Sequence, residues 1–246
     1  MLASMPMYDW PEIREDTDRF WAALAKELGV SGPLWRGADH TAPWHNPDLL
    51  FSQTCGYPFT HALRGQVKLV ATPQYTADGC EGPNYCSFVF ARKQKPLATF
   101  RGQIAAINGP DSMSGMLALK LAFAGVAMPM PFFADTIVTG GHIASLQAVQ
   151  KGEADVCAID AVCVALAKRH RPSLLEGMHV VAQSPSVPGL PFITQQFEVL
   201  ALQNALTKIF EDEALSETRE RLLLKSFSIL KTSDYDVILQ RENSIV

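Results

Sequence analysis

The chain has 246 residues, of which 48% are hydrophobic and 19% are charged, and its formal net charge is −4. A chain of this length and hydrophobicity can bury a large core, so its composition excludes an intrinsically disordered protein. The slightly acidic balance gives no electrostatic reason to expect binding to nucleic acid or to an anionic membrane. Arg14 is the first basic residue, so no signal peptide is visible. We therefore expect a cytoplasmic protein as the sequence is written, or a periplasmic one if a leader has been removed.

Short apolar runs alternate with helical patterns through the first half of the chain. The runs at residues 2–8, 49–52, 67–71 and 87–92 predict strands. Asp9, followed three residues later by Glu12, is typical of a capping box, and it predicts a helix that begins there and ends at Gly29.

The second half continues the same alternation. Strands are predicted at 104–107, 136–138, 154–159, 180–182 and 191–194, with helices after the first three and a mostly helical C-terminal region. The run at 154–159 is apolar on both faces, which is typical of a central parallel strand. Together these patterns predict an α/β fold with parallel sheets, in which ligands bind beyond the carboxyl ends of the strands.

Ser112, Met113, Ser114 and Gly115 open a helix directly after a predicted strand. The first amide groups of a helix have no intrahelical acceptor, and with two hydroxyl groups beside them they would suit a tetrahedral oxyanion. The alternative is structural, with Ser112 acting only as the N-cap and Gly115 only as a packing residue.

Three further positions have both a functional and a structural interpretation. His142 follows two glycines at the start of a helix, and it either donates to an anion or is a surface or capping residue. Asp160 follows the buried strand, and it either accepts from a ligand ammonium or hydroxyl group or caps the next helix. Gln53 and Thr54 either line a cleft at a strand end or belong to a polar turn.

The five cysteines show neither C-x-x-C spacing nor a histidine at a zinc-like distance, so we expect no metal site. Cys55 and Cys80 lie in polar segments at strand ends that we expect on the same lobe. They could form a disulfide in an oxidising compartment, although not in a reducing cytoplasm.

Four motifs in order resemble one protein family. Residues 109–115 resemble its S-x-S-G phosphonate-binding turn, and residues 139–142 followed by 154–158 resemble its next block. Residues 184–189 resemble its S-P-x-x-P-G return segment, and residues 84–87 resemble its G-Y-x-S crossover. On these motifs the chain is identified as a member of the phosphate/phosphonate-binding branch of type II periplasmic binding proteins of ABC importers.

The resemblance implies two α/β lobes, residues 1–90 with 188–246 and residues 91–187, which are joined by two crossover segments and separated by an interlobe cleft. It implies that Ser112, Ser114 and the amides of Met113 and Gly115 hold the anionic group, and that His142 adds a donor. Tyr85 would line the cleft, and Asp160 would contact the polar end of the ligand. We also expect Tyr8, Gln53 and Thr54 of the first lobe to contact the ligand. At residues 53–55 the family has an aromatic side chain, which this chain lacks.

The implied function is that of a solute-binding protein, without catalytic activity or cofactor, that captures a small oxyanion or organophosphonate-like ligand, an anion or a zwitterion, for an ABC permease. We expect the protein to be a monomer. The alternatives are a cytoplasmic enzyme on the same fold, as in menaquinone or thiamine-pyrimidine synthesis, and a ligand-sensing protein. No Lys or Arg occurs in residues 109–119, 139–150 or 153–167. We therefore expect neutral donors and helix N-termini to hold the anion, with a preference for a monoanion or a zwitterion over a dianion.

Overall fold

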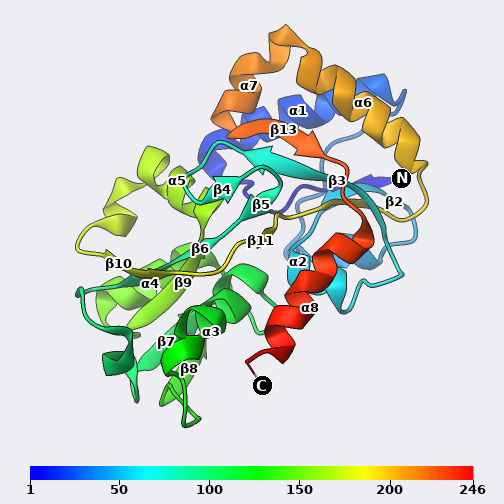
Figure 1. Cartoon of the computed structure of the whole chain (residues 1–246). Coiled ribbons are helices and arrows are strands. Elements are labelled where there is room, and N and C mark those ends of the chain that lie inside the picture. Colours follow the sequence, from blue (N-terminus) through cyan, green and yellow to red (C-terminus); the bar gives the residue numbers. More distant parts are fainter. Residues whose placement is uncertain (246) are drawn as a thin grey trace. The chain divides into compact units, whose positions relative to one another are not determined.

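The computed structural model describes residues 1–245 (Figure 1). Contacts among these residues divide the chain into two compact units, neither of which is one continuous stretch of sequence. Unit 1 contains residues 1–76, 81–83 and 188–235. Unit 2 contains residues 77–80, 84–187 and those from Asp236 onward.

The helices and strands alternate along most of the chain. The α-helices are α1 (Arg14–Glu27), α2 (Gly56–Thr60), α3 (Ala118–Phe123), α4 (His142–Lys151), α5 (Ala161–His170), α6 (Val199–Glu211), α7 (Ser216–Arg221) and α8 (Asp236–Asn243). The strands are β1 (Leu2–Ala3), β2 (Leu49–Gln53), β3 (Lys68–Tyr75), β4 (Cys80–Glu81), β5 (Asn84–Tyr85), β6 (Ser87–Ala91), β7 (Ile104–Ile107), β8 (Asp135–Val138), β9 (Val156–Asp160), β10 (His179–Gln183), β11 (Val187–Pro188), β12 (Phe192–Thr194) and β13 (Leu224–Ser228).

Unit 1 is built on a five-stranded sheet in the order β1-β2-β12-β3-β13. Strand β1 is parallel to β2, and β12 is antiparallel to both β2 and β3. Strands β1, β2 and β3 therefore run in one direction, and their carboxyl ends share one edge. Helices α1, α6 and α7 lie together beside this sheet (Figure 1). Phe20, Phe51 and Phe192 form its core, with the rings of Phe51 and Phe192 4.9 Å apart.

Unit 2 is built on a second five-stranded sheet, in the order β10-β6-β9-β7-β8. Strand β7 is parallel to both β8 and β9, whereas β6 is antiparallel to β9 and to β10. The carboxyl ends of β7, β8 and β9 therefore also share an edge. Helix α4 packs on these strands with Leu146 and Val149 fully buried.

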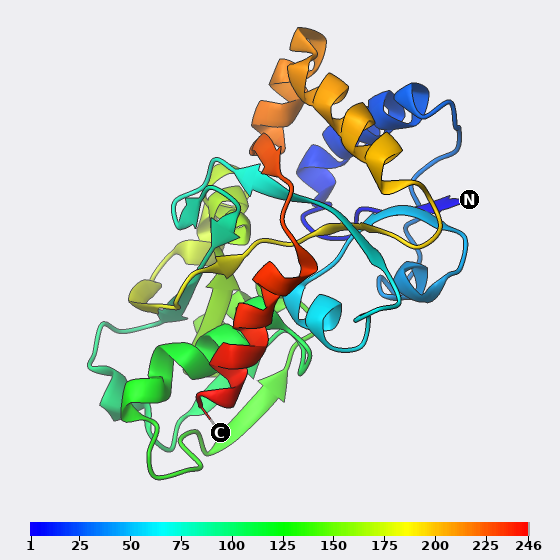
Figure 2. The same cartoon turned by 45° about the vertical axis from the view of Figure 1, so that its right-hand side comes forward.

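The division between the units differs from the expected one at three places. Residues 77–80 and 84–90 group with unit 2, although we expected them in the first lobe. The C-terminal helix α8 also groups with unit 2, and Figure 2 shows it along the green part of the chain. Ile238 of this helix is fully buried, so α8 packs on the fold through an apolar side chain.

Most of the predicted strands are confirmed, but three expectations about local structure are wrong. Strand β1 ends at Ala3, and the chain turns at Tyr8. Helix α1 follows a 3-10 turn whose start has no side-chain cap, because Asp9 pairs with Arg36 at 2.6 Å. The sheets are mixed, because β6, β10, β12 and β13 run against their neighbours. The C-terminal region is mostly helical, as expected, and β13 is a strand within it that was not predicted.

Candidate functional site

The helix after β7 begins with the predicted serine turn. Ser112 has extended backbone angles, and its Oγ accepts a hydrogen bond of 3.0 Å from the Gly115 amide. This is the capping role that was one of the two interpretations of Ser112. The Gly115 amide, expected to hold an anion, therefore already has an acceptor in this structure. The first turn after Ser112, Met113–Leu117, has π-helical geometry, which occurs in proteins mostly as single turns within α-helices and is frequent at functional sites.

Gly115 is required at its position by a close approach. A Cβ atom added there would overlap Oδ1 of Asn108 and lie 3.3 Å from the Asn108 backbone nitrogen. Oδ1 of Asn108 is buried and accepts no hydrogen bond within residues 1–245. The absence of a side chain at Gly115 thus allows the end of β7 to lie directly against the serine turn.

Ser114 and His142 are brought together although they are 28 residues apart. Ser114 Oγ and His142 Nε2 lie 2.9 Å apart, and which atom donates depends on the histidine tautomer. Ser114 is buried, and His142 is the first residue of α4. Both residues follow parallel neighbouring strands, so the shared carboxyl edge of β7 and β8 explains why they meet.

A second hydrogen-bonded group, which sequence reasoning missed, holds α4 in place. Thr139 Oγ1 donates to the carbonyl of Ile107 at 3.0 Å and lies 2.7 Å from Ser145 Oγ. Thr139 thereby joins the end of β7 to the first turn of α4, which carries His142. The hydroxyl residues on both sides of the glycine pair could have suggested this group, but nothing in the sequence shows that they lie close together.

Burial determines the charge of His142. Its Nδ1 is enclosed, and desolvation lowers the pKa of the ring to about 4, although the backbone of Ala158 opposes this by favouring the charged form. At neutral pH the imidazole is therefore uncharged. It then has one N–H donor and one acceptor nitrogen.

Asp160 is buried at the end of β9 and caps α5. Its Oδ1 accepts from the amides of Val162 at 2.7 Å and Cys163 at 3.1 Å. The structure thus shows the capping role, and contact with a ligand stays a prediction. Burial raises the pKa of the Cys80 thiol to about 12 and that of the Cys163 thiol well above its ordinary value. The negative charge of Asp160 is the second cause of both increases. Tyr85, the remaining predicted residue of unit 2, is buried on β5.

The predicted residues of unit 1 gather at the carboxyl edge of its own sheet. Gln53 ends β2, Thr54 follows it, and both are buried. Tyr8 lies beyond β1 with a φ of 63°, a strained value for a residue with a side chain. Its ring lies edge-on to that of Tyr75, which ends β3, with 5.3 Å between the centroids. The structure thus brings together two sets of predicted residues, one in each unit.

Cys55 and Cys80 are not joined by a disulfide in the structure. Cys55 belongs to unit 1 and Cys80 to unit 2, so the expectation that both lie on one lobe is wrong. The reason is that the segment 77–80, expected to continue the first lobe, groups with the other unit.

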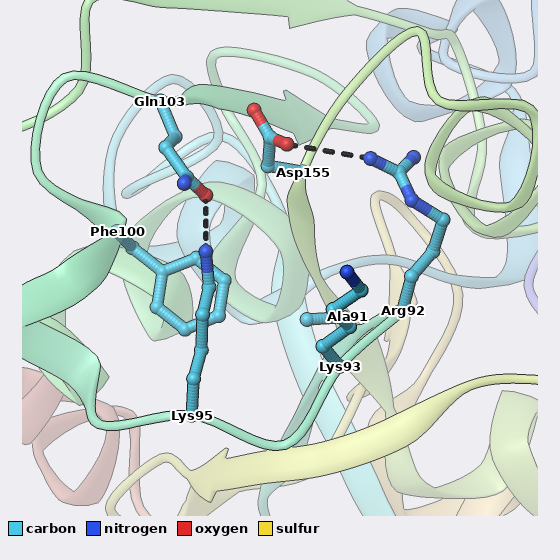
Figure 3. Close-up of a pocket in the computed structure, with 7 residues that line it drawn as sticks. All are labelled: Ala91, Arg92, Lys93, Lys95, Phe100, Gln103 and Asp155. Atoms are coloured by element: carbon cyan, nitrogen blue, oxygen red, sulfur yellow. Dashed lines mark hydrogen bonds and ion pairs between the residues drawn. The ribbon is translucent and has the colours of Figure 1, made fainter.

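A pocket of about 200 Å³ lies elsewhere in unit 2, lined by Ala91, Arg92, Lys93, Lys95, Phe100, Gln103 and Asp155 (Figure 3). Two of its three cationic side chains, Arg92 and Lys95, already have partners. The Arg92 guanidinium donates to two backbone carbonyls, at 2.5 and 3.0 Å, and pairs with Asp155 at 3.4 Å. Lys95 donates to Gln103 at 2.8 Å. These contacts tie strand and helix ends together, so the pocket is better explained by the fold than by an anion site.

Two further kinds of site can be addressed within residues 1–245. None of the helices there is long and apolar enough to cross a membrane. In the same residues, His, Cys, Asp and Glu side chains form no group of three or more that could hold a metal ion.

Comparison with solved structures shows the fold. The PhnD1 protein of Prochlorococcus marinus, in complex with methylphosphonate, is 14% identical with a TM-score of 0.77, over 98% of this chain and 97% of that one. A binding protein component of an ABC phosphonate transporter from Pseudomonas aeruginosa is 17% identical with a TM-score of 0.76, over 98% and 85%. A Xanthomonas citri protein bound to ATP is 15% identical with a TM-score of 0.72, over 99% and 96%. These are two-lobed α/β proteins of the type II periplasmic binding fold, as expected.

Comparison with curated sequences finds no match to the chain. The family comparison is decisive, because one family model matches residues 2–235, which is nearly the whole chain. Its description is that of the periplasmic substrate-binding protein of a phosphonate ABC transporter. The chain therefore belongs to the family of phosphonate-binding periplasmic substrate-binding proteins of ABC transporters.

Proposed function

We propose that this chain binds a small phosphonate or a related oxyanion through Ser112, Met113, Ser114, Gly115 and His142 of unit 2, and delivers it to an ABC permease in the periplasm. The observation that carries the proposal is the contact of 2.9 Å between Ser114 Oγ and His142 Nε2, at the starts of two helices. It brings a hydroxyl and an uncharged imidazole side by side at the starts of two helices, whose N-termini each carry a partial positive charge that favours an anion.

The carboxyl edge formed by β7, β8 and β9 supports this location. The segments that follow these three strands carry Ser114, His142 and Asp160, so parallel pairing brings all three to one edge of the sheet. Ligands of open α/β sheets bind at such edges. Tyr85 on β5 and the residues Tyr8, Gln53 and Thr54 of unit 1 would contact the remainder of the ligand.

The charge of the site selects the ligand. No Lys or Arg occurs within residues 109–119, 139–150 or 153–167, and the buried ring of His142 is neutral near pH 7. Two helix N-termini supply roughly one positive charge together, which suits a monoanion. The carboxylate of Asp160 would oppose a second negative charge and favour a ligand with an ammonium group. We therefore propose a monoanion, or a zwitterion such as an aminoalkyl phosphonate, as the ligand.

The Ser114–His142 pair could also suggest an enzyme with a serine nucleophile. In such enzymes the other ring nitrogen is oriented by a third group, most often a carboxylate. Here Nδ1 of His142 has no carboxylate partner among the described residues, and the site lies on the fold of a transport family. Both observations support binding without a chemical step.

Isothermal titration calorimetry of the purified protein tests the proposal. Methylphosphonate, 2-aminoethylphosphonate and inorganic phosphate would be titrated at pH values from 5 to 9. We expect the zwitterion to bind most tightly and the affinity for phosphate not to rise as phosphate becomes dianionic. Absence of binding by all three would contradict the proposed function. Affinity for phosphate that rises steadily with pH would contradict the proposed charge preference.

A further inference from the structure

The buried hydroxyl of Tyr235 joins two segments of unit 1 that are far apart in the sequence. Tyr235 is 0% exposed, and its Oη donates to the carbonyl of Gly189 at 2.9 Å and lies 2.7 Å from Thr72 Oγ1. A carbonyl can only accept, so the proton of Tyr235 goes to Gly189 and Thr72 donates to Tyr235. Burial raises the pKa of the Tyr235 hydroxyl, which therefore keeps its proton at neutral pH. The three groups form one hydrogen-bonded chain with a fixed direction.

This cluster lies where the main chain passes between the two units. Pro83, Gly189 and Tyr235 belong to unit 1, and each lies within two residues of such a passage. The Gly189 amide donates to the Pro83 carbonyl at 2.7 Å. A Cβ atom on Gly189 would lie 3.3 Å from that carbonyl oxygen and 3.6 Å from the one of Pro73, so the segments pack closely. Contacts inside unit 1 thus hold together three points at which the chain leaves or enters it.

Helix α8 begins directly after Tyr235 and depends on packing for its stability. It has eight residues, and isolated helices shorter than about 12–15 residues are marginal in water. Ile238 is fully buried, and Arg241 donates to the carbonyl of Ser186 in unit 2 at 3.1 Å. The family model ends at residue 235, so α8 follows the matched region. Its role therefore has to be found in its own contacts and in the point from which it starts.

Fixing the start of α8 lowers the entropic cost of docking it. With Tyr235 held in unit 1, the residue that precedes the helix is already in place. Release of Tyr235 would lengthen the tether back to strand β13, which ends at Ser228. A longer flexible tether lowers the effective concentration of the helix at its docking position. The Tyr235 hydroxyl therefore bears on whether α8 stays docked.

We propose that Tyr235 is a latch that couples helix α8, and with it the stability of unit 2, to unit 1. While Thr72 and Gly189 hold the hydroxyl, α8 remains docked. When this hydrogen-bonded chain is broken, α8 opens and unit 2 loses one of its helices. The latch involves no ligand, so it stands apart from the proposed function.

Hydrogen–deuterium exchange of the full chain, followed by mass spectrometry of a peptide that covers α8, tests the latch. Tyr235→Phe removes the hydroxyl and keeps the ring, which packs against Phe59 with 4.8 Å between the centroids. We expect α8 to exchange at least about tenfold faster in this variant, because a buried hydrogen-bonded chain is lost. Thr72→Val should have the same effect on α8, although Thr72 is 163 residues away from Tyr235.

Tyr75→Phe is the matched control. Tyr75 ends strand β3 of unit 1, and its hydroxyl accepts from Gln53 Nε2 at 2.9 Å, so this variant also loses a tyrosine hydroxyl that has a hydrogen bond. We expect the exchange of α8 to stay within about twofold of the unaltered chain. Urea unfolding followed by tryptophan fluorescence measures the stability of unit 1 in each variant, because all four tryptophans belong to that unit: Trp10, Trp21, Trp35 and Trp44.

The outcomes separate a latch from a general loss of stability. Unchanged exchange of α8 in both Tyr235→Phe and Thr72→Val overturns the proposal. Acceleration of α8 by the same factor in Tyr75→Phe, at an equal loss of stability of unit 1, also overturns it. If Tyr235→Phe does not fold, Thr72→Val and Thr72→Ser decide the question. The serine variant keeps the hydroxyl and should restore the slow exchange, and equally fast exchange in both would count against the latch.

Discussion

Ser114 and His142 share a hydrogen bond of 2.9 Å that joins the first turns of two helices in unit 2. The bond fixes the serine hydroxyl beside a neutral imidazole without any cationic side chain. In a protein that binds an anion, this arrangement supplies hydrogen bonds and leaves the charge balance to helix dipoles. The serine and the histidine can each be substituted alone, so that the contribution of each is measured separately.

Replacing Ser114 by Ala is expected to weaken phosphonate binding roughly tenfold to a hundredfold, because one hydroxyl group that bonds a charged ligand is lost. Calorimetry with methylphosphonate and 2-aminoethylphosphonate measures the change. Ser228→Ala is the matched control, since its hydroxyl accepts from Gln74 at 2.8 Å in unit 1. Unchanged affinity of Ser114→Ala for every oxyanion tested would count against the site.

The stability of the protein should depend on pH through His142. Burial lowers the pKa of its ring from 6.5 to about 4 in the folded state, so the unfolded chain binds a proton in this window that the folded chain does not. The free energy of unfolding should therefore fall as the pH is lowered from about 6.5 to about 4, and this contribution should be constant above that window. The expected loss between pH 7.5 and pH 5 is about 2 kcal/mol.

Urea unfolding of the unaltered chain and of His142→Gln at these two pH values isolates this contribution. The variant should lose about 2 kcal/mol less than the unaltered chain over the same interval. An identical pH dependence in both proteins would show that the imidazole is not held in its neutral form by burial.

Asp160 offers a way to separate capping from charge. Asn is as good an N-cap as Asp, so Asp160→Asn should keep the hydrogen bonds to the amides of Val162 and Cys163. Asp160→Ala removes them and should lower the free energy of unfolding by about 0.5–2 kcal/mol more than Asp160→Asn does. Thermal and urea unfolding of both variants measure the difference. Equal destabilisation would mean that the carboxylate charge matters more than the cap.

Gly115→Ala should destabilise unit 2 by about 1–3 kcal/mol, because the added Cβ overlaps the Asn108 side chain. Asn108→Ala removes the overlapping atoms, so the double variant should recover part of the loss. A double-mutant cycle by urea unfolding measures this coupling. Additive effects of the two substitutions would indicate that the serine turn adjusts without contact between these residues.

All five cysteines should titrate as thiols in the denatured protein, since none of them forms a disulfide within residues 1–245. The intact mass should not change on reduction. In the folded protein Cys80 should react slowly with iodoacetamide at pH 8, because burial and the charge of Asp160 raise the pKa of its thiol to about 12. A mass increase of two hydrogen atoms on reduction would show that a disulfide forms after all.

Much of unit 2 could be predicted from the sequence because its signals are local. The strand at 104–107 and the cap at Ser112 depend on neighbouring residues only, and both are found as expected. The Gln53 contacts could not be predicted, because its partners Tyr75 and Leu190 are 22 and 137 residues away. Such contacts follow from the order of strands in the sheet, which one sequence does not reveal.

The C-terminal region was harder to predict for a different reason. Strand β13, with the sequence Leu-Lys-Ser-Phe-Ser, is short and partly polar, and it lies at the edge of the sheet with one pairing partner. Nothing in its composition separates it from a loop or a short helix. The grouping of α8 with unit 2 depends on its contacts with residues distant in the sequence, which are a property of the complete fold.

The interleaving of the two units in the sequence has a consequence for how the chain acquires its structure. Unit 1 needs strand β12 and helix α6, and unit 2 needs helix α8, so both lack a component until the last part of the chain is available. During synthesis, the N-terminal half therefore has no unit that it can complete alone. Incomplete chains of this kind expose apolar surface and unpaired strand edges, which makes them aggregation-prone. A chain truncated before α8 should therefore aggregate more readily than the chain of 246 residues.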